Sequence, residues 1–359
     1  MDALTTPSNW QRVRLGDILT LKHGRDYKNF KLGNIPVYGS GGYMLSINNF
    51  LHNGESVCIG RKGTIDKPIY LNGKFWVVDT LFYSYSFKKS IPKFIFYAFS
   101  IIKWSNYNEA TGVPSLTKMT ISNIEIPLPP LNEQIAIANI LSDVDHYLYT
   151  LDALIFKKES IKKALSFELL SQRKRLKGFN QAWQRVRLGD ICEIVKGQQI
   201  NKISLNNTDK YPVINGGIDF LGYTNKFNVS KNTIAISEGG TCGYVRFMKS
   251  DFWSGGHNYS LQKISNKVNN LCLYHILKSY EKDIMKLGVG SGLKNIQLKA
   301  LKDFEILLPP LNEQIAIANI LSALDHEIIS LKNKKRQFDN IKKALNHDLM
   351  SAKIRVLEK

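Results

Sequence analysis

Features that mark several common protein classes are scarce in this sequence. Only four of the 359 residues are cysteines, at positions 58, 192, 242 and 272, and no two of them form a CxxC pair. This spacing argues against a disulfide framework or a zinc site and indicates reduced thiols. No apolar run reaches the ~18 residues of a membrane span. The opening MDALTTPSNW lacks the basic and apolar segments of a secretory signal. We therefore predict a cytoplasmic protein that binds no metal.

Signatures of catalysis are missing as well. The Gly-Lys pair at 73–74 lacks the upstream spacing of a phosphate-binding loop, and no glycine-rich dinucleotide fingerprint opens a helix. Both Pro-Pro pairs follow leucine, not the Asp or Asn of a pocket for a flipped base. An Asp-His pair repeats at 145–146 and 325–326, and we interpret it as a helix-surface or partner contact. The chain is predicted to recognise and scaffold rather than to catalyse.

Acidic residues are few relative to basic ones. Asp and Glu number 30 against 49 Lys and Arg, so the formal net charge is +19. A balance this basic predicts a polyanionic partner, either a nucleic acid or an acidic membrane surface.

What the chain does contain is long identical repeats. The stretch LPPLNEQIAIANILS occupies residues 128–142 and again 308–322, and WQRVRLGDI occupies 10–18 and again 183–191. The spacing between copies is 180 residues for the first motif and 173 for the second. This small difference is typical of two copies of one domain that differ by short loop insertions. We predict variable domains at 1–127 and 178–307, with shared segments at 128–177 and 308–359.

The two variable domains have an α+β pattern. Short β-branched runs that end in glycine, VCIGRKG and TIAISEGG, predict strands that enter turns. Apolar residues three to four positions apart predict one amphipathic helix per domain, at 92–107 and at 271–287.

The shared segments are predicted to be long helices. Each begins after a Pro-Pro pair, and Glu133 and Glu313 fall in the first turn, where a carboxylate suits the positive end of the helix dipole. About 45 residues would make a rod of ~65 Å. A four-three apolar rhythm predicts an antiparallel coiled coil with pseudo-two-fold symmetry, although a simple helix bundle stays an alternative. The seam comprises Ile137, Leu141, Val144, Leu148, Leu151 and Ile155, with Ile317, Leu321, Leu324, Ile328 and Leu331 in the second copy; after a slip it resumes at Ile161, Leu165 and Leu169, and at Phe338, Ile341, Leu345 and Leu349.

Two similar basic domains suit DNA, whose two-fold readers contact half-sites about one turn apart, ~34 Å, or a multiple of that. Because the two domains differ in sequence, they should read different half-sites. Arginine or lysine can read guanine, whereas glutamate accepts from cytosine N4, so a swap between matched loops would change the base preference. The candidate DNA contacts lie in three matched pairs of loops, for each of which an ordinary turn is the alternative: Ser40, Gly41, Gly42, Arg61, Lys62, Thr64, Ser115 and Lys118 in the first domain, and Asn215, Gly216, Ser237, Glu238, Thr241, Ser291 and Lys294 in the second. The basic run at 157–178 could also contact phosphates or form a solvated helix face.

The layout resembles the specificity subunit of type I restriction-modification enzymes. The resemblance covers essentially the whole chain and depends on LPPLNEQIAIANIL, which opens each long helix, on WQRVRLGDI, which opens each variable domain, and on the tandem arrangement. It implies two target-recognition domains that read a bipartite, asymmetric DNA site, with paired helices that set the spacer and dock two methyltransferase subunits.

The resemblance also implies which chemistry belongs to the partners. The methyltransferase subunits would hold S-adenosylmethionine and methylate adenine N6, and a motor and nuclease subunit would use ATP and Mg²⁺. None of these cofactors is expected in this chain, which is then not an enzyme by itself. The candidate docking residues are the same in both copies: Leu131, Glu133, Gln134, Leu311, Glu313 and Gln314.

Three alternatives stay open at this point. The chain could be a nuclease or methyltransferase in its own right, a protein-binding scaffold without DNA readout, or an inactive copy kept as a reservoir for recombination. Methyl transfer by the purified chain alone would favour the first, and DNA binding that is absent or insensitive to salt would favour the second.

Overall fold

The computed structural model describes residues 7–356; residues 1–6, part of the stretch examined for a secretory signal, and 357–359, the end of the second shared segment, lie outside the described residues. The chain divides into two compact units. Unit 1 is Met1–Asp152 with Asn333–Lys359, and unit 2 is Ala153–Lys332. No helix in the described part of the chain is long and apolar enough to cross a membrane.

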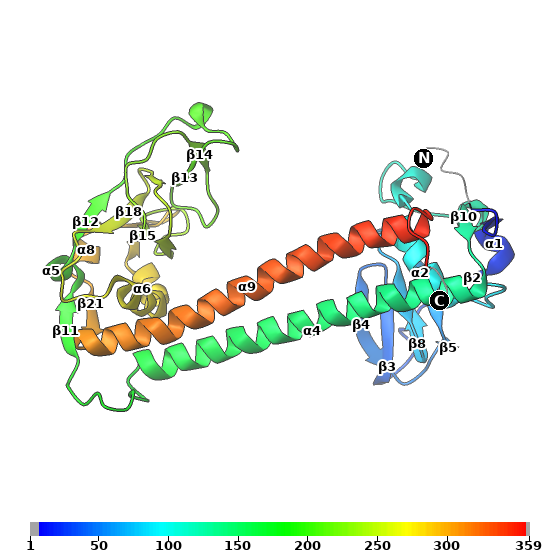
Figure 1. Cartoon of the computed structure of the whole chain (residues 1–359), viewed down its shortest axis with the longest axis horizontal. Coiled ribbons are helices and arrows are strands. Elements are labelled where there is room, and N and C mark those ends of the chain that lie inside the picture. Colours follow the sequence, from blue (N-terminus) through cyan, green and yellow to red (C-terminus); the bar gives the residue numbers. More distant parts are fainter. Residues whose placement is uncertain (1–6, 357–359) are drawn as a thin grey trace. The chain divides into compact units, whose positions relative to one another are not determined.

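Unit 1 is built from two four-stranded sheets and a two-stranded ribbon (Figure 1). The sheet orders are β2-β9-β6-β7 and β4-β3-β8-β5, and the ribbon pairs β1 with β10. Helix α2 packs against the first sheet and against the long helix α4 through one apolar core. The elements are β1 (Gln11–Arg14), α1 (Leu15–Ile18), β2 (Thr20–His23), β3 (Leu32–Gly39), β4 (Gly42–Ile47), β5 (His52–Asn53), β6 (Ser56–Gly60), β7 (Ile69–Leu71), β8 (Lys74–Val77), β9 (Leu81–Tyr85), α2 (Pro92–Ile101), η1 (Trp104–Tyr107), α3 (Lys118–Asn123), β10 (Glu125–Leu128) and α4 (Leu131–Leu170).

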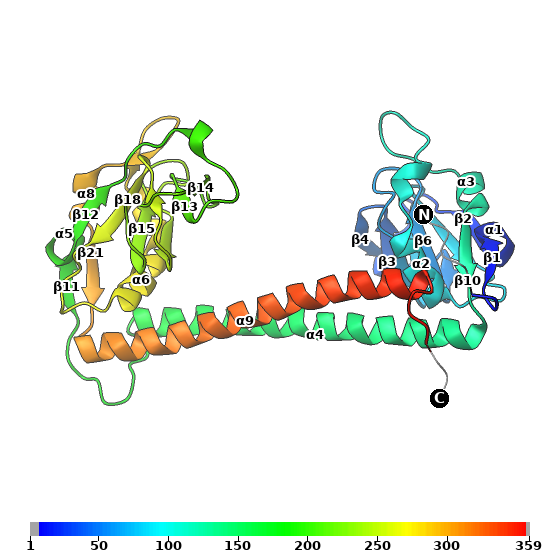
Figure 2. The same cartoon turned by 45° about the horizontal axis from the view of Figure 1, so that its top comes forward.

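Unit 2 repeats this plan with shorter strands. Its sheet β12-β18-β15-β16 corresponds to β2-β9-β6-β7 of unit 1, and its ribbon pairs β11 with β21. Helix α6 packs between this sheet and α9, as Figure 2 shows from a second direction. The elements are β11 (Gln184–Arg187), α5 (Leu188–Ile191), β12 (Glu193–Lys196), η2 (Lys202–Ser204), β13 (Tyr211–Ile214), β14 (Gly222–Thr224), β15 (Thr233–Ser237), β16 (Val245–Met248), β17 (Trp253–Ser254), β18 (Asn258–Gln262), α6 (Asn270–Ser279), α7 (Glu281–Lys286), β19 (Gly288–Val289), β20 (Asn295–Ile296), α8 (Leu298–Lys302), β21 (Glu305–Leu308) and α9 (Leu311–Met350).

The repeated motifs meet in space within each unit. The QRVR of the first motif forms β1, which pairs antiparallel with β10, the strand that leads into LPPLNEQ; β11 and β21 repeat the pairing. Gln11 lies opposite Leu128, and Gln184 lies opposite Leu308. The two motifs are therefore repeated together because they build one joint between domain and helix.

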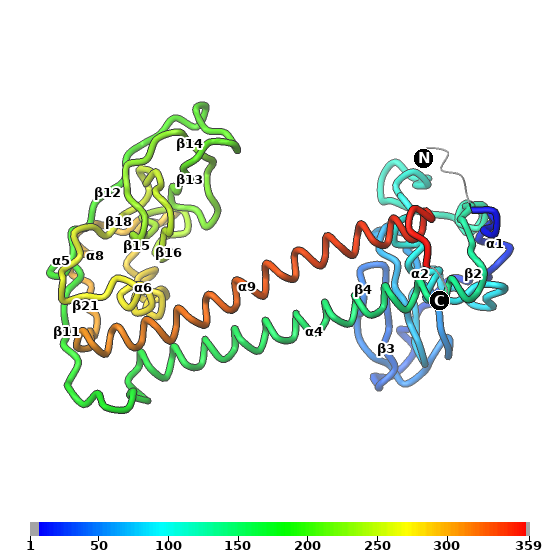
Figure 3. The backbone as a smooth tube through the Cα atoms, viewed as in Figure 1, coloured from blue at the N-terminus to red at the C-terminus, as the bar shows by residue number. Residues whose placement is uncertain are grey.

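The α+β fold class is confirmed, and α4 and α9 are both single helices of 40 residues (Figure 3). Within each unit a segment of α4 runs antiparallel to a segment of α9. In unit 2, Lys158 pairs with Glu327 at 2.7 Å and Lys162 pairs with Asp325. Lys332 also pairs with Glu159 at 2.6 Å in unit 2. In unit 1, Asp152 pairs with Lys335 at 2.8 Å and Asp145 pairs with Lys342.

The apolar seam is interrupted rather than continuous after its predicted slip, although Leu169 and Leu349 near its far ends are buried. Ile137, Leu141 and Leu148 are buried, but Ile161 and Ile341 are 42% and 51% exposed. The prediction that the seam resumes at these two isoleucines is therefore wrong. Next to these isoleucines, Lys162 pairs with Asp325 and Lys342 pairs with Asp145 on the facing helix, so ion pairs contribute to this part of each helix pair.

The predicted amphipathic helices are each broken in two. The segment 92–107 forms α2 and the short helix η1, where buried Trp104 donates from Nε1 to the carbonyl of Phe99 at 2.9 Å and closes the end of α2. The segment 271–287 forms α6 and α7, which meet at Tyr280. The three-to-four spacing runs through both breaks and does not reveal them.

Candidate nucleic-acid interface

The equivalent sheets present one loop cluster in each unit. His23 lies opposite Phe82 in the β2–β9 pair, as Lys196 lies opposite Tyr259 in the β12–β18 pair. In both units the residue directly after the next strand, β6 or β15, is held by two backbone hydrogen bonds. In unit 1 this residue is Arg61, whose N–H donates to Thr80 O at 2.8 Å and whose carbonyl accepts from Leu116 at 2.9 Å.

Glu238 occupies the place of Arg61 in unit 2. Its N–H donates to the carbonyl of His257 at 3.0 Å, and its carbonyl accepts from Ile296 at 2.9 Å. The swap between these matched positions therefore exchanges a cation for an anion at one backbone site, although the residue that matches Ser237 is Gly60.

The cluster in unit 1 is cationic. Arg61, Lys62 and Lys118 line an open hollow together with His23, whose ring lies 4.8 Å from that of Phe82. The guanidinium of Arg61 donates to the carbonyl of Asp79 at 3.0 Å. Such a hollow suits phosphates or the acceptor atoms of a guanine.

The cluster in unit 2 is centred on a buried carboxylate. Lys196 donates to Glu238 Oε1 at 2.6 Å, and His257 Nδ1 lies 3.8 Å from Glu238 Oε2. The Tyr259 hydroxyl lies 3.4 Å from Oε1, and burial together with the neighbouring Glu238 raises the pKa of Tyr259 to about 12. The side chain of Glu238 is only 11% exposed, whereas those of Lys196 and His257 are more than half exposed.

The remaining predicted contacts in unit 1 lie around the same hollow or beside it. Ser115 forms an isolated antiparallel β-bridge with Lys62 and lines the hollow. Thr64 follows Lys62 in the same partly buried loop. Ser40 and Gly41 connect β3 to β4 in a hairpin, where Gly42 has a φ of +111° that favours glycine. This hairpin borders a second hollow, next to Asp79 and Thr80.

In unit 2 the predicted contacts divide into buried and exposed groups. Asn215 accepts from the N–H of His257 at 2.9 Å, and the carbonyl of Gly216 accepts from the N–H of Thr241 at 2.8 Å. Asn215, Gly216 and Thr241 therefore hold the backbone around the Glu238 cluster in place. Gly216 has a φ of +81°, and a Cβ there would meet the carbonyl of Gly239 at 2.5 Å. Ser237 is 3% exposed and is a strand residue of the core. Ser291 and Lys294, by contrast, lie in the exposed hairpin between β19 and β20.

Sequence reasoning missed His23, Lys196 and His257. His23 and Lys196 are the last residues of β2 and β12, each separated by one strand from the strand that precedes Arg61 or Glu238, and His257 directly precedes β18. The alternating apolar and polar residues of 193–196 could have predicted a strand that ends at Lys196. Only the order of the strands in the sheet shows that its side chain reaches Glu238.

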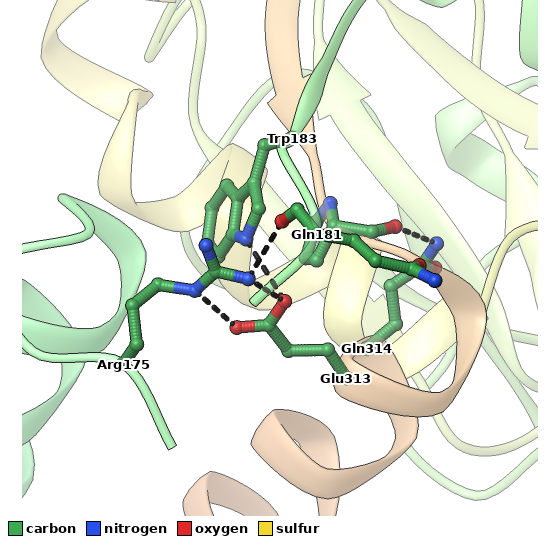
Figure 4. A network of polar contacts seen from close by, with 6 residues as sticks. Arg175, Gln181, Trp183, Glu313 and Gln314 are labelled. Carbon is green, nitrogen blue, oxygen red and sulfur yellow. Dashed lines mark hydrogen bonds and ion pairs between the residues drawn. The ribbon is translucent and has the colours of Figure 1, made fainter. Parts of the chain in front are cut away.

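Four of the candidate docking residues, Glu133, Gln134, Glu313 and Gln314, have buried side chains. Glu313 is 1% exposed and accepts from Arg175 at 2.8 and 2.7 Å and from Trp183 Nε1 at 3.0 Å (Figure 4). In unit 1 the same network joins Glu133 to Arg355, at 2.7 and 3.1 Å, and to the indole N–H of Trp10 at 3.0 Å. We call these two contacts the Arg–Glu–Trp networks. Each joins the segment after one long helix to the start of the other helix and to the tryptophan that directly precedes the first strand of the domain.

The two glutamines are used in the same way. Gln314 accepts from the N–H of Asn269 at 2.7 Å and donates to the carbonyls of Lys267 and Pro309. Gln134 makes the equivalent bonds to Ile91, Lys89 and Pro129. Because all four polar side chains are buried and bonded internally, the geometry favours a structural role for them over direct docking.

The apolar docking candidates face outward. Leu131 and Leu311 are 48% and 39% exposed, and one turn further Ile135 and Ile315 are 45% and 40% exposed. The first turns of α4 and α9 thus present the same exposed apolar face in each unit.

Two α+β domains with charged loop clusters, each joined to long helices by a repeated joint, define a tandem nucleic-acid-recognition protein. The sequence matches the type I restriction modification DNA specificity domain at residues 7–161 and 180–338. The chain therefore belongs to the type I restriction-modification specificity family, whose subunits recognise the DNA target.

Known proteins that resemble this chain are named as specificity subunits of the same family. The chain is 26% identical to the type I restriction enzyme MjaVIII specificity subunit of Methanocaldococcus jannaschii over 99% of this chain and 95% of that one. It is 38% identical to a putative type I specificity subunit of Mycoplasma pneumoniae over 44% of each chain, and so spans less than half the length of that relative. The crystal structure of a specificity subunit from M. genitalium has the same fold, with a TM-score of 0.78, 20% identity and 97% coverage of both chains.

Proposed function

We propose that the chain is the DNA-recognition and scaffold subunit of a type I restriction-modification complex and acts in the cytoplasm. Each unit reads one half of a bipartite, asymmetric site. The observation that carries this proposal is the exchange of Arg61 for Glu238 at one matched backbone site in two domains of similar plan. Two domains with opposite charge at the same backbone site suit two different half-sites.

The helix starts supply the scaffold in this proposal. Two copies of one methyltransferase subunit need two like surfaces, and the exposed faces at Leu131 with Ile135 and at Leu311 with Ile315 provide them. Exposed apolar residues in matched patches are typical of protein–protein contacts. The methyltransferase subunits would bind S-adenosylmethionine, and the motor and nuclease subunits would bind ATP and Mg²⁺, so the chain contributes recognition and no catalytic group.

The proposal is tested by modification-detecting sequencing of the host genome, with the gene intact and deleted. A bipartite motif with methylated adenine on each strand should disappear on deletion. Exchange of residues 1–127 for the corresponding domain of another specificity subunit should then change one half of the motif. An unchanged methylation pattern on deletion, or a change in both halves after the exchange, would contradict the proposal.

A further inference from the structure

The Glu238 cluster contains a buried carboxylate oxygen without a partner. Oε1 accepts from Lys196, but Oε2 is buried and no donor in residues 7–356 is within hydrogen-bonding distance of it. An ionised carboxylate in such a place costs free energy unless cations compensate it. The cationic or protonatable groups beside it are Lys196 and, 3.8 Å from Oε2, His257.

The exposure of the three side chains shows which of them can contact a ligand. Glu238 is 11% exposed, whereas Lys196 and His257 are 53% and 55% exposed. An ammonium has three N–H donors, and only one of those on Lys196 is directed to Glu238. His257 has Nδ1 nearest the carboxylate, which leaves Nε2 for a contact elsewhere.

The backbone fixes the base of this arrangement. Glu238 and His257 are joined through the N–H of Glu238, and the N–H of His257 is held by Asn215. Gly239 packs against this cluster so closely that a Cβ there would lie 2.3 Å from Asn295 Oδ1. The two exposed side chains therefore project from a rigid platform, which base readout requires because its hydrogen bonds are directional.

We propose that Lys196 and His257 read a base edge in the half-site of unit 2, and that Glu238 is the positioning residue that holds them. This inference rests on the proposed function. Two donors directed at one edge suit guanine, whose O6 and N7 both accept in the major groove. In this proposal Glu238 acts through Lys196 and His257 and does not contact the base, in contrast to the sequence-based expectation that it accepts from cytosine N4.

Unit 1 reads by different means in this scheme. The place of the carboxylate is taken by Arg61, and the place of Lys196 by His23, so the cation is itself at the strand end. The two units would then prefer different half-sites, because unit 1 contacts DNA through the guanidinium of Arg61 and unit 2 through the ammonium of Lys196, which a carboxylate holds in place.

The test uses the full chain, expressed in the deletion strain together with its natural partner subunits. Lys196→Gln and Glu238→Gln are compared with wild type by modification-detecting sequencing. Lys263→Gln is the matched control, because Lys263 is 81% exposed and lies at the opposite end of the same strand pair. Arg61→Gln marks the half-site that belongs to unit 1. Thermal unfolding of each purified variant shows that it is folded.

Lys196→Gln and Glu238→Gln should both reduce discrimination at one position, or two adjacent positions, of one half-site, by on the order of ten-fold or more. The other half-site, the one that Arg61→Gln alters, should stay unchanged, and Lys263→Gln should behave like wild type. Glu238→Gln is informative because a merely structural substitution would lower methylation at all sites without changing the motif.

Two results would overturn the inference while leaving the proposed function intact. One is an unchanged motif in both variants, and the other is a uniform loss of methylation with the same motif, which would assign Lys196 to a phosphate. If wild-type chain restores no methylation at all, the proposed function fails instead.

Discussion

Replacing Glu313 with glutamine should destabilise unit 2 strongly, although the two side chains have nearly the same shape. The carboxylate is 1% exposed and accepts three hydrogen bonds, two from Arg175 and one from Trp183. Glutamine leaves one acceptor and turns an N–H₂ group toward the guanidinium. Breaking a buried ion pair from one side costs about 3–5 kcal/mol. Because the Arg175 side chain is 26% exposed and water can solvate part of it, we expect about 3 kcal/mol.

This loss is measured by chemical and thermal unfolding of the purified chain. At roughly 2–4 °C per kcal/mol for a domain of this size, the unfolding midpoint of unit 2 should fall by on the order of 10 °C. Glu305→Gln is the matched control, because Glu305 pairs with Arg185 at 3.1 Å on the surface, with 44% and 69% exposed side chains. An exposed pair of this kind contributes about 0–1 kcal/mol.

A double substitution separates the pair from the burial of a lone charge. Glu313→Gln combined with Arg175→Gln should cost less than the sum of the two single changes, because no unpaired cation remains. If Glu313→Gln unfolds like wild type, the Arg–Glu–Trp network does not stabilise the joint, and the docking interpretation of this glutamate would regain support. In unit 1, Glu133→Gln should change stability in the same direction.

Three further predictions concern charge, pH and docking. Lys62→Gln should weaken DNA binding at every sequence and reduce the slope of log binding constant against log salt by about 0.9, measured by salt titration; an unchanged slope would remove Lys62 from the phosphate contacts. His275 is buried, and its burial, with the nearby Lys162 opposing and Asp325 favouring the charged form, lowers its pKa to about 4. The unfolded chain then binds the proton first, so the free energy of unfolding should fall by up to about 3 kcal/mol as pH drops from ~6.5 to ~4, and His275→Gln should flatten this part of the pH profile. Ile135→Glu or Ile315→Glu alone should reduce the methyltransferase stoichiometry, measured by analytical ultracentrifugation, from two to one; two bound copies in either variant would place docking elsewhere.

The sequence alone predicted the repeated plan and the two long helices. Identical fifteen-residue stretches report a shared structure directly, and a helical rhythm that persists for several turns is a strong local signal. The family resemblance follows from the same stretches. These features depend on residues that are close in sequence, so no tertiary information was needed.

Local patterns were misleading where long-range contacts decide the outcome. Ile161 and Ile341 continue the apolar rhythm and yet are exposed, while the lysine after each, Lys162 or Lys342, pairs with an aspartate of the facing helix. Periodicity reports which residues share a face but not which face meets the other helix.

The candidate site shows the same division. The sequence by itself determined that Arg61 and Glu238 occupy matched loops, since each follows a recognisable strand. Only the tertiary structure decided that Lys196 and His257 flank that glutamate, because the order of strands in the sheet brings together residues that lie about 20 to 40 positions away from it in the chain. The repeated glutamates lead to the same conclusion: the sequence marked Glu133 and Glu313 as important, but their burial against an arginine and a tryptophan more than 100 residues distant revealed what they hold together.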